Sequence, residues 1–247
     1  HSFGLYLIPV TEYLEVGRET FGFAFALQGF IAGAGAFIFG AISDKYGSGI
    51  ASFIGAILFI VGLVLFANVG SSTDIIISQC MIGFGASGTG VSVTLGAVGR
   101  VATDKNRTLY LGVVMAGAST GQFIILPIST FLLQTFDWSQ SLIYLAILSS
   151  SMLFFAFALN FSSKSKSSIE GTNQSIKEAL IEALYSKSFI LLTIGFFVCG
   201  FHITLVGTHV PTYVTDRGLE GWTAAVILSL IGLFNIFGSL LSGYLST

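Results

Sequence analysis

Long apolar runs alternate with short polar clusters along most of the chain. The apolar runs cover about 21–42, 50–69, 75–98, 108–133, 140–159, 189–214 and 222–245. Each run has roughly the 20 residues that a membrane-spanning helix needs, and none shows the alternation that is typical of a barrel strand. Because a helix satisfies its own backbone hydrogen bonds in hydrocarbon, the pattern predicts an all-α membrane protein.

The composition agrees with a lipid environment. Of the 247 residues, 53% are hydrophobic and only 9% are charged, whereas a soluble domain carries about 25% charged residues. Cys80 and Cys199 both lie in apolar runs, so we expect buried thiols and no disulfide. The chain has no basic stripe, nucleophile–base set or cofactor loop, so we expect no nucleic-acid partner, no enzyme activity and no cofactor.

The two ends of the sequence indicate a fragment. The first apolar run, 1–10, is too short to span a membrane and lacks the basic start and cleavage site of a signal peptide. We interpret it as the end of a first span, and the run 222–245 as an eighth span.

An internal repeat predicts two halves. A shift of 203 residues superposes Gly4 on Gly207, Gly29 on Gly232, Gly35 on Gly238 and Gly40 on Gly243. The copies lie six spans apart, which fits parallel halves of six helices each. We therefore divide the chain into 1–159 (first half, its first span incomplete), 160–188 (linker) and 189–247 (start of the second half). In the linker, the capping-box pattern Ser175–Glu178 predicts a short amphipathic helix at the membrane face.

The distribution of basic residues predicts the orientation. One set of loops, which includes 39–49 and the linker, carries Lys45, Arg100, Lys105, Arg107, Lys164, Lys166, Lys177 and Lys187. The opposite set carries only Arg18 and Arg217, together with seven acidic residues. Because Lys and Arg are retained on the cytoplasmic side, the first set of loops is predicted to be cytoplasmic.

The most specific motif lies between the second and third spans. The residues Gly40, Asp44, Lys45 and Gly47 have the spacing G-x-x-x-D-K-x-G, which resembles the loop signature of the major facilitator superfamily. Phe25–Gln28, Val114–Phe123, Thr208–Tyr213 and Leu233–Gly238 resemble the bacterial monocarboxylate-transporter-like branch. The resemblance implies the major facilitator fold, a monomeric carrier and a location in the bacterial inner membrane.

The same resemblance gives the signature a role. In the family, the loop aspartate makes charge contacts that hold the inward gate closed, which assigns Gly40, Asp44, Lys45 and Gly47 to a gating loop. The simpler alternative is a turn that needs its glycines and leaves its charges solvated. The chain departs from the family pattern at Ser48 and Gly49, where basic residues are usual, and at Gln79, where arginine is frequent.

The predicted spans contain no charged residue that must lie at mid-bilayer, so the solute site must be built from polar side chains. The candidates are Tyr6, Gln28, Gln122, His202, His209 and Asn235. For each, interhelical hydrogen bonding is the alternative role. The repeat places His209 opposite Tyr6, which suggests a facing pair across a central cavity. His202 and His209 are two helical turns apart, so no metal site is expected.

These observations favour a secondary carrier that moves a small solute across the bilayer by alternating access. By branch resemblance the solute is a monocarboxylate or other organic anion, with a proton as the candidate symported ion. Against this, the run 222–245 has no arginine, which carboxylate carriers of the branch often place there. Efflux of a neutral or amphiphilic compound, or a membrane sensor without transport activity, are the alternatives.

Overall fold

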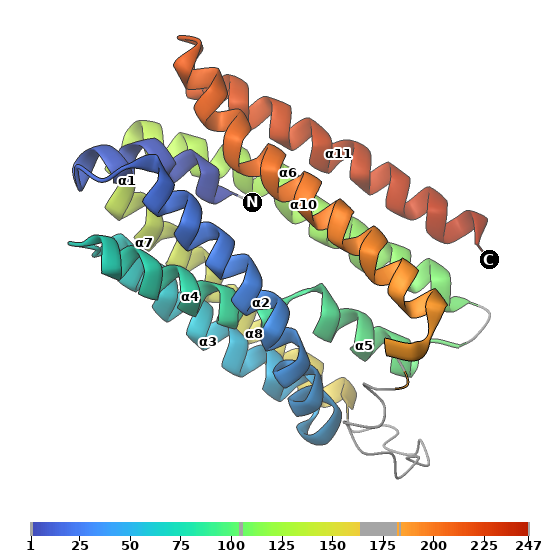
Figure 1. Ribbon diagram of the computed structural model, residues 1–247. Coiled ribbons are helices and arrows are strands. Elements are labelled where there is room, and N and C mark those ends of the chain that lie inside the picture. The colour runs from blue at the N-terminus through green and yellow to red at the C-terminus, as the bar shows by residue number, and fades with distance from the viewer. Residues whose placement is uncertain (1, 104–105, 164–181, 183, 247) are drawn as a thin grey trace.

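The computed structural model describes residues 2–103, 106–163, 182 and 184–246 (Figure 1). These residues form helices joined by short turns. The helices are, in chain order, η1 (Ser2–Tyr6), α1 (Leu7–Tyr13), α2 (Arg18–Tyr46), α3 (Ser48–Ala67), α4 (Ser72–Thr89), α5 (Val91–Val101), α6 (Arg107–Thr135), α7 (Trp138–Ser149), α8 (Ser151–Ser163), α10 (Lys187–Asp216) and α11 (Gly221–Leu245). In this part of the chain, seven helical segments are long and apolar enough to cross a membrane, which confirms the seven predicted spans.

The fourth predicted span, 75–98, is not one continuous helix as expected. Gly90 adopts an extended conformation (ψ 178°) between α4 and α5. Its carbonyl accepts hydrogen bonds from the Thr94 amide (3.3 Å) and the Thr94 hydroxyl (3.1 Å), and so begins α5. Glycine is the residue that most weakens a helix interior apart from proline, which accounts for the break.

Figure 1 shows α2, α3, α4, α7 and α8 side by side in one group, with α6, α10 and α11 in a second group. The short helix α5 lies between the two groups near one end. The main hydrophobic cluster joins η1, α1, α2, α3, α4 and α7 and includes Tyr6, Phe21, Phe66, Ile82 and Leu142. This cluster packs most helices of the first group against one another.

Helix α6 belongs by sequence to the first predicted half, yet its most extensive contact is with α11 of the second. Three glycines allow the backbones to approach closely. A Cβ atom on Gly112 would lie 2.8 Å from the Ser239 carbonyl oxygen, and one on Gly232 would lie 3.0 Å from the Phe123 amide nitrogen. A Cβ atom on Gly243 would lie 3.1 Å from the carbonyl oxygen of Thr108. Small residues of this kind are how membrane helices associate.

Because the spans alternate in direction, their connections fall at two ends of the bundle. The turns at 14–17, 68–71, 136–137 and 217–220 lie at the end that begins α2, which we term the Arg18 end. The turn at Gly47 lies at the opposite end, together with Ala102, Thr103 and Asn106, and we term this the Asp44 end. The predicted linker helix at Ser175–Glu178 falls outside the described residues.

Candidate functional site: the signature loop and a cavity between α6, α10 and α11

The signature loop is a tight turn between α2 and α3. Its backbone depends on Gly47, which has φ 98°, a value that L-residues with side chains rarely adopt. Lys45 places its Nζ atom 5.2 Å from the centroid of the Tyr46 ring. Gly47 therefore has the role that the simpler alternative gives it, which is to allow a tight turn. This role is separate from that of the charged residues Asp44 and Lys45.

Asp44 also has the charge contact that the family resemblance implied. Arg100, near the end of α5, donates from Nη1 to the Asp44 carboxylate at 2.8 Å. Its Nη2 donates to the Ser43 hydroxyl at 3.0 Å and to the Ser48 hydroxyl. Both serines are buried, and their oxygens are 3.0 Å apart. One guanidinium thus fastens α5 to the loop between α2 and α3.

A second ion pair lies at the opposite end of the bundle. Arg18, the first residue of α2, donates from its two terminal nitrogens to the two carboxylate oxygens of Asp216, at 2.9 and 3.0 Å. Asp216 is the last residue of α10 and lies 198 positions further along the chain. This pair is the bidentate type that fixes geometry best.

A cavity of about 190 Å³ lies between α6, α10 and α11. Its lining comprises Gln122, Leu126, His202, Ile203, Val206, Gly207, Leu228, Ile231 and Asn235. Three of the six predicted solute-contacting residues therefore meet in one cavity, each from a different helix. A largely apolar cavity with a few convergent polar groups is the usual form of a small-molecule site.

The polar groups of this cavity differ in how they are engaged. The Gln122 amide donates from Nε2 to the Leu228 carbonyl at 3.3 Å, across the α6–α11 contact. Among the residues that the structure describes, the His202 imidazole and the Asn235 amide have no hydrogen-bond partner. Two polar side chains are thus available to a solute, and the third orients the helices around it.

The other three predicted residues lie elsewhere. Tyr6 is fully buried in the main hydrophobic cluster, where its hydroxyl is 2.7 Å from the Ser141 hydroxyl. Gln28 is half-buried on α2, and its backbone carbonyl lies against Gly83 of α4. His209 is exposed on α10. The lining of the α6–α10–α11 cavity includes none of the three.

Comparison with known proteins gives the family directly. Residues 2–247 match the family model described as Major Facilitator Superfamily. The chain belongs to the major facilitator superfamily. It is 20% identical to monocarboxylate transporter 11 of Mus musculus over 99% of this chain and 55% of that protein. It is 21% identical to monocarboxylate transporter 13 of Bos taurus and 22% identical to monocarboxylate transporter 13 of Rattus norvegicus.

Both transporters 13 are matched over 99% of this chain and 56% of their own length. The chain therefore spans about half the length of these curated relatives. Superfamily membership makes it a multi-pass membrane protein of a transporter family, in line with its seven apolar helices.

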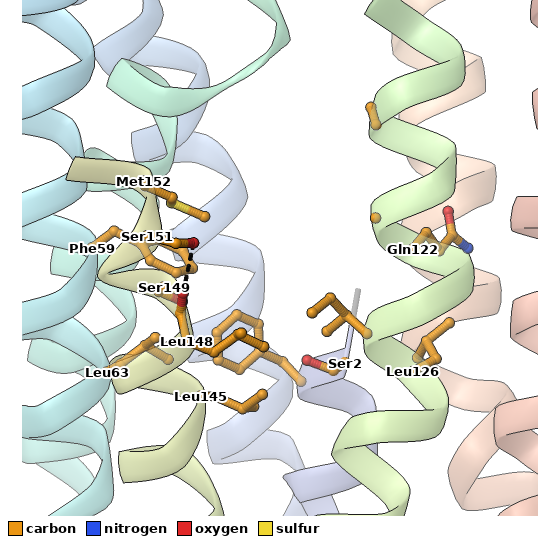
Figure 2. Close-up of a pocket in the computed structure, with 14 residues that line it drawn as sticks. Ser2, Phe59, Leu63, Gln122, Leu126, Leu145, Leu148, Ser149, Ser151 and Met152 are labelled. Atoms are coloured by element: carbon orange, nitrogen blue, oxygen red, sulfur yellow. Dashed lines mark hydrogen bonds between the residues drawn. The ribbon is translucent and has the colours of Figure 1, made fainter. Parts of the chain in front are cut away.

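The protein has a second, larger cavity of about 320 Å³ (Figure 2). Its lining is mostly apolar and comes from η1, α3, α6, α7 and α8. The Ser151 hydroxyl is already engaged, since it donates to the Leu148 carbonyl at 2.8 Å. Figure 2 shows Gln122 on the side of α6 that faces away from Phe59 and Leu63. The main polar group of the lining is thus directed toward the α6–α10–α11 cavity.

Sequence reasoning did not identify Arg100, Arg18 and Asp216 as structural partners, because it used them only to orient the chain. A signal for the Arg18–Asp216 pair was nevertheless present. Arg18 and Arg217 are the only basic residues among seven acidic ones in their set of loops, so each had several possible partners. The side-chain roles of Ser43 and Ser48 had no such signal.

Proposed function

We propose that this protein is a secondary active carrier that moves a small monocarboxylate or related organic anion by alternating access. Membership of the superfamily and the relation to proteins named monocarboxylate transporters support this function. The observation that carries it is the cavity in which Gln122, His202 and Asn235 meet. It lies between helices from both predicted halves, where a carrier needs its site.

The chemistry of the lining favours a solute that arrives with a proton. In the described lining no Lys, Arg, Asp or Glu is present, so the imidazole of His202 is the group that can supply a positive charge. A protonated His202 would pair with a carboxylate, and the Asn235 amide would donate a second hydrogen bond. The apolar residues Leu126, Val206 and Ile231 would contact the rest of a short acid.

Uptake into proteoliposomes tests this proposal. We expect labelled lactate, pyruvate or oxalate to exchange across the membrane, with uptake that increases as the external pH falls. His202→Gln removes the titratable group and retains a hydrogen-bonding side chain. It should raise the apparent KM by about tenfold or more, since a hydrogen bond to a charged group contributes about 1.5–3 kcal/mol, and it should flatten the pH profile.

His209→Gln is the matched comparison, because His209 lies on the same helix outside the cavity. A larger effect at His209 than at His202 would move the site to the pair that the repeat predicts, Tyr6 and His209. Absence of uptake across a panel of carboxylates, with the protein folded, would refute the organic-anion substrate. The lack of fixed charge in the lining would then favour efflux of a neutral or amphiphilic compound.

A further inference from the structure

The α6–α10–α11 cavity and the larger cavity are neighbours that share part of their lining. Gln122 and Leu126, one helical turn apart on α6, line both the space of about 190 Å³ that holds His202 and the space of about 320 Å³. Among the residues that the structure describes, the two linings have only this pair in common. One turn of α6 therefore forms the boundary between the two cavities.

The two boundary residues differ in how firmly they are held. Gln122 donates from Nε2 to the Leu228 carbonyl of α11, which anchors its amide on the side of the α6–α10–α11 cavity. Leu126 is fully buried and apolar, and it borders a cavity on two sides, which gives its side chain room to change rotamer. The boundary is thus polar toward His202 and apolar at Leu126.

The larger cavity offers few hydrogen-bonding groups to a ligand. Side chains such as Phe59, Leu63 and Ile125 dominate its described lining, which includes no Lys, Arg, Asp, Glu or His. An apolar cavity of about 150 Å³ is large enough to bind benzene, and this one has more than twice that volume. The space therefore suits an alkyl or phenyl group. It disfavours a carboxylate, because a buried charge without a partner is costly.

We propose that the larger cavity is a second subsite, which binds the hydrocarbon tail of a monocarboxylate whose carboxylate lies at His202. The tail passes Leu126, and Gln122 keeps its amide beside the carboxylate end. Acids with an alkyl or aryl tail use both cavities, whereas lactate or acetate fills the α6–α10–α11 cavity alone and binds more weakly. The inference rests on the proposed transport function, and it adds a substrate class, namely monocarboxylates with a hydrocarbon tail.

Gly121 provides a way to fill the tail subsite without disturbing the packing of α6. It lines the larger cavity, and a Cβ atom built on it has nothing within 4 Å. Gly121→Leu therefore places a side chain in the space that the tail needs. Gly117→Leu is the matched control. Gly117 lies one turn earlier on α6, also has nothing within 4 Å, and is absent from the described linings of both cavities.

The test measures how strongly unlabelled straight-chain acids compete with labelled lactate for uptake into proteoliposomes. Burial of one methylene group contributes about 0.8 kcal/mol, which corresponds to about a fourfold lower inhibition constant. Hexanoate has two methylene groups more than butyrate, so its inhibition constant should be about fifteenfold lower. In Gly121→Leu this difference should shrink to about twofold or less, because the tail stays outside the cavity. Gly117→Leu should keep the full difference.

A second comparison locates the carboxylate. His202→Gln should raise the inhibition constants of butyrate and hexanoate by the same factor, because both acids place their carboxylate at the same imidazole. The ratio between the two acids should therefore stay at its parental value in His202→Gln, although it falls in Gly121→Leu. A change of the ratio in His202→Gln would show that the longer acid binds elsewhere, and would overturn the shared site.

Equal inhibition by butyrate and hexanoate in the parent protein, or a difference that survives in Gly121→Leu, would overturn the tail subsite. An equal loss in Gly117→Leu and Gly121→Leu would also overturn it, because damage to α6 would then explain both. Uptake of lactate with no effect of chain length would refute the subsite and leave the proposed function standing.

Binding of labelled hexanoate to the purified protein separates the subsite from transport. If the protein takes up no short acid, yet binds hexanoate in a way that Gly121→Leu abolishes and Gly117→Leu retains, the proposed function fails and the tail subsite stands. Absence of both uptake and binding would refute the two together.

Discussion

At the scale of single residues, Ser48 shows how a departure from a family pattern can be accommodated. Serine stands there in place of the usual basic residue, and the structure brings Arg100 from α5 to the same position. Arg100→Gln should lower the free energy of unfolding by about 1–2 kcal/mol, because it removes charge-assisted bonds to Asp44 and two serines in a partly exposed setting. Ser48→Ala should have a smaller effect, since Arg100 keeps Asp44 and Ser43.

Thermal unfolding in detergent measures this difference. Arg107→Gln is the control. It removes a cation from the same end of the bundle, and Arg107 makes no ion pair in the described structure. If Arg107→Gln and Arg100→Gln shifted the melting temperature equally, the general charge of this end would matter and the Arg100 contacts would not.

The residue scale also shows where prediction from sequence ends. That Asp44 needs a cationic partner could be predicted from the signature, but the identity of that partner could not. Arg100 lies 56 positions away, and its direction depends on the break at Gly90. Likewise, a buried tyrosine near a helix end gives no sign that Ser141, 135 residues later, will take its hydroxyl.

At the scale of helices, the close contact of α6 with α11 separates glycines that look alike in the sequence. Gly112→Ala should destabilise the protein by about 1–3 kcal/mol, because the new methyl group would meet the Ser239 carbonyl oxygen 2.8 Å away. Gly117→Ala, five residues further along α6, has nothing within 4 Å of its new methyl group. It should be neutral or stabilising, by up to about 1 kcal/mol of helix propensity.

Chemical or thermal unfolding of the two alanine variants checks this contrast directly. Loss of stability at Gly117, or none at Gly112, would show that α6 and α11 pack through other faces than those described. The number of spans and their approximate limits followed from the lengths of the apolar runs, because spanning length is set by the bilayer. Which glycines pack and which lie open did not, because both kinds occur in the same apolar runs.

At the scale of the whole molecule, the repeat of 203 residues predicts where an axis between the two halves would pass. Gly4 and Gly207 are equivalent in the repeat, and they touch. Two equivalent positions can touch only near the axis that relates them, so this contact is where a symmetry axis between parallel halves would pass. The equivalents Gly29 and Gly232 behave differently. Gly232 packs closely on α6, while Gly29 has nothing within 4 Å in the described residues.

The orientation in the membrane is a prediction for the whole molecule. The excess of Lys and Arg at the Asp44 end predicts that this end is cytoplasmic. With the native cysteines replaced by alanine, Asp137→Cys at the Arg18 end should react with an impermeant maleimide added to intact cells. Tyr46→Cys, exposed at the Asp44 end, should react only after the cells are opened. The reverse pattern would place Arg18 and Asp216 in the cytoplasm and would contradict the orientation predicted from the basic residues.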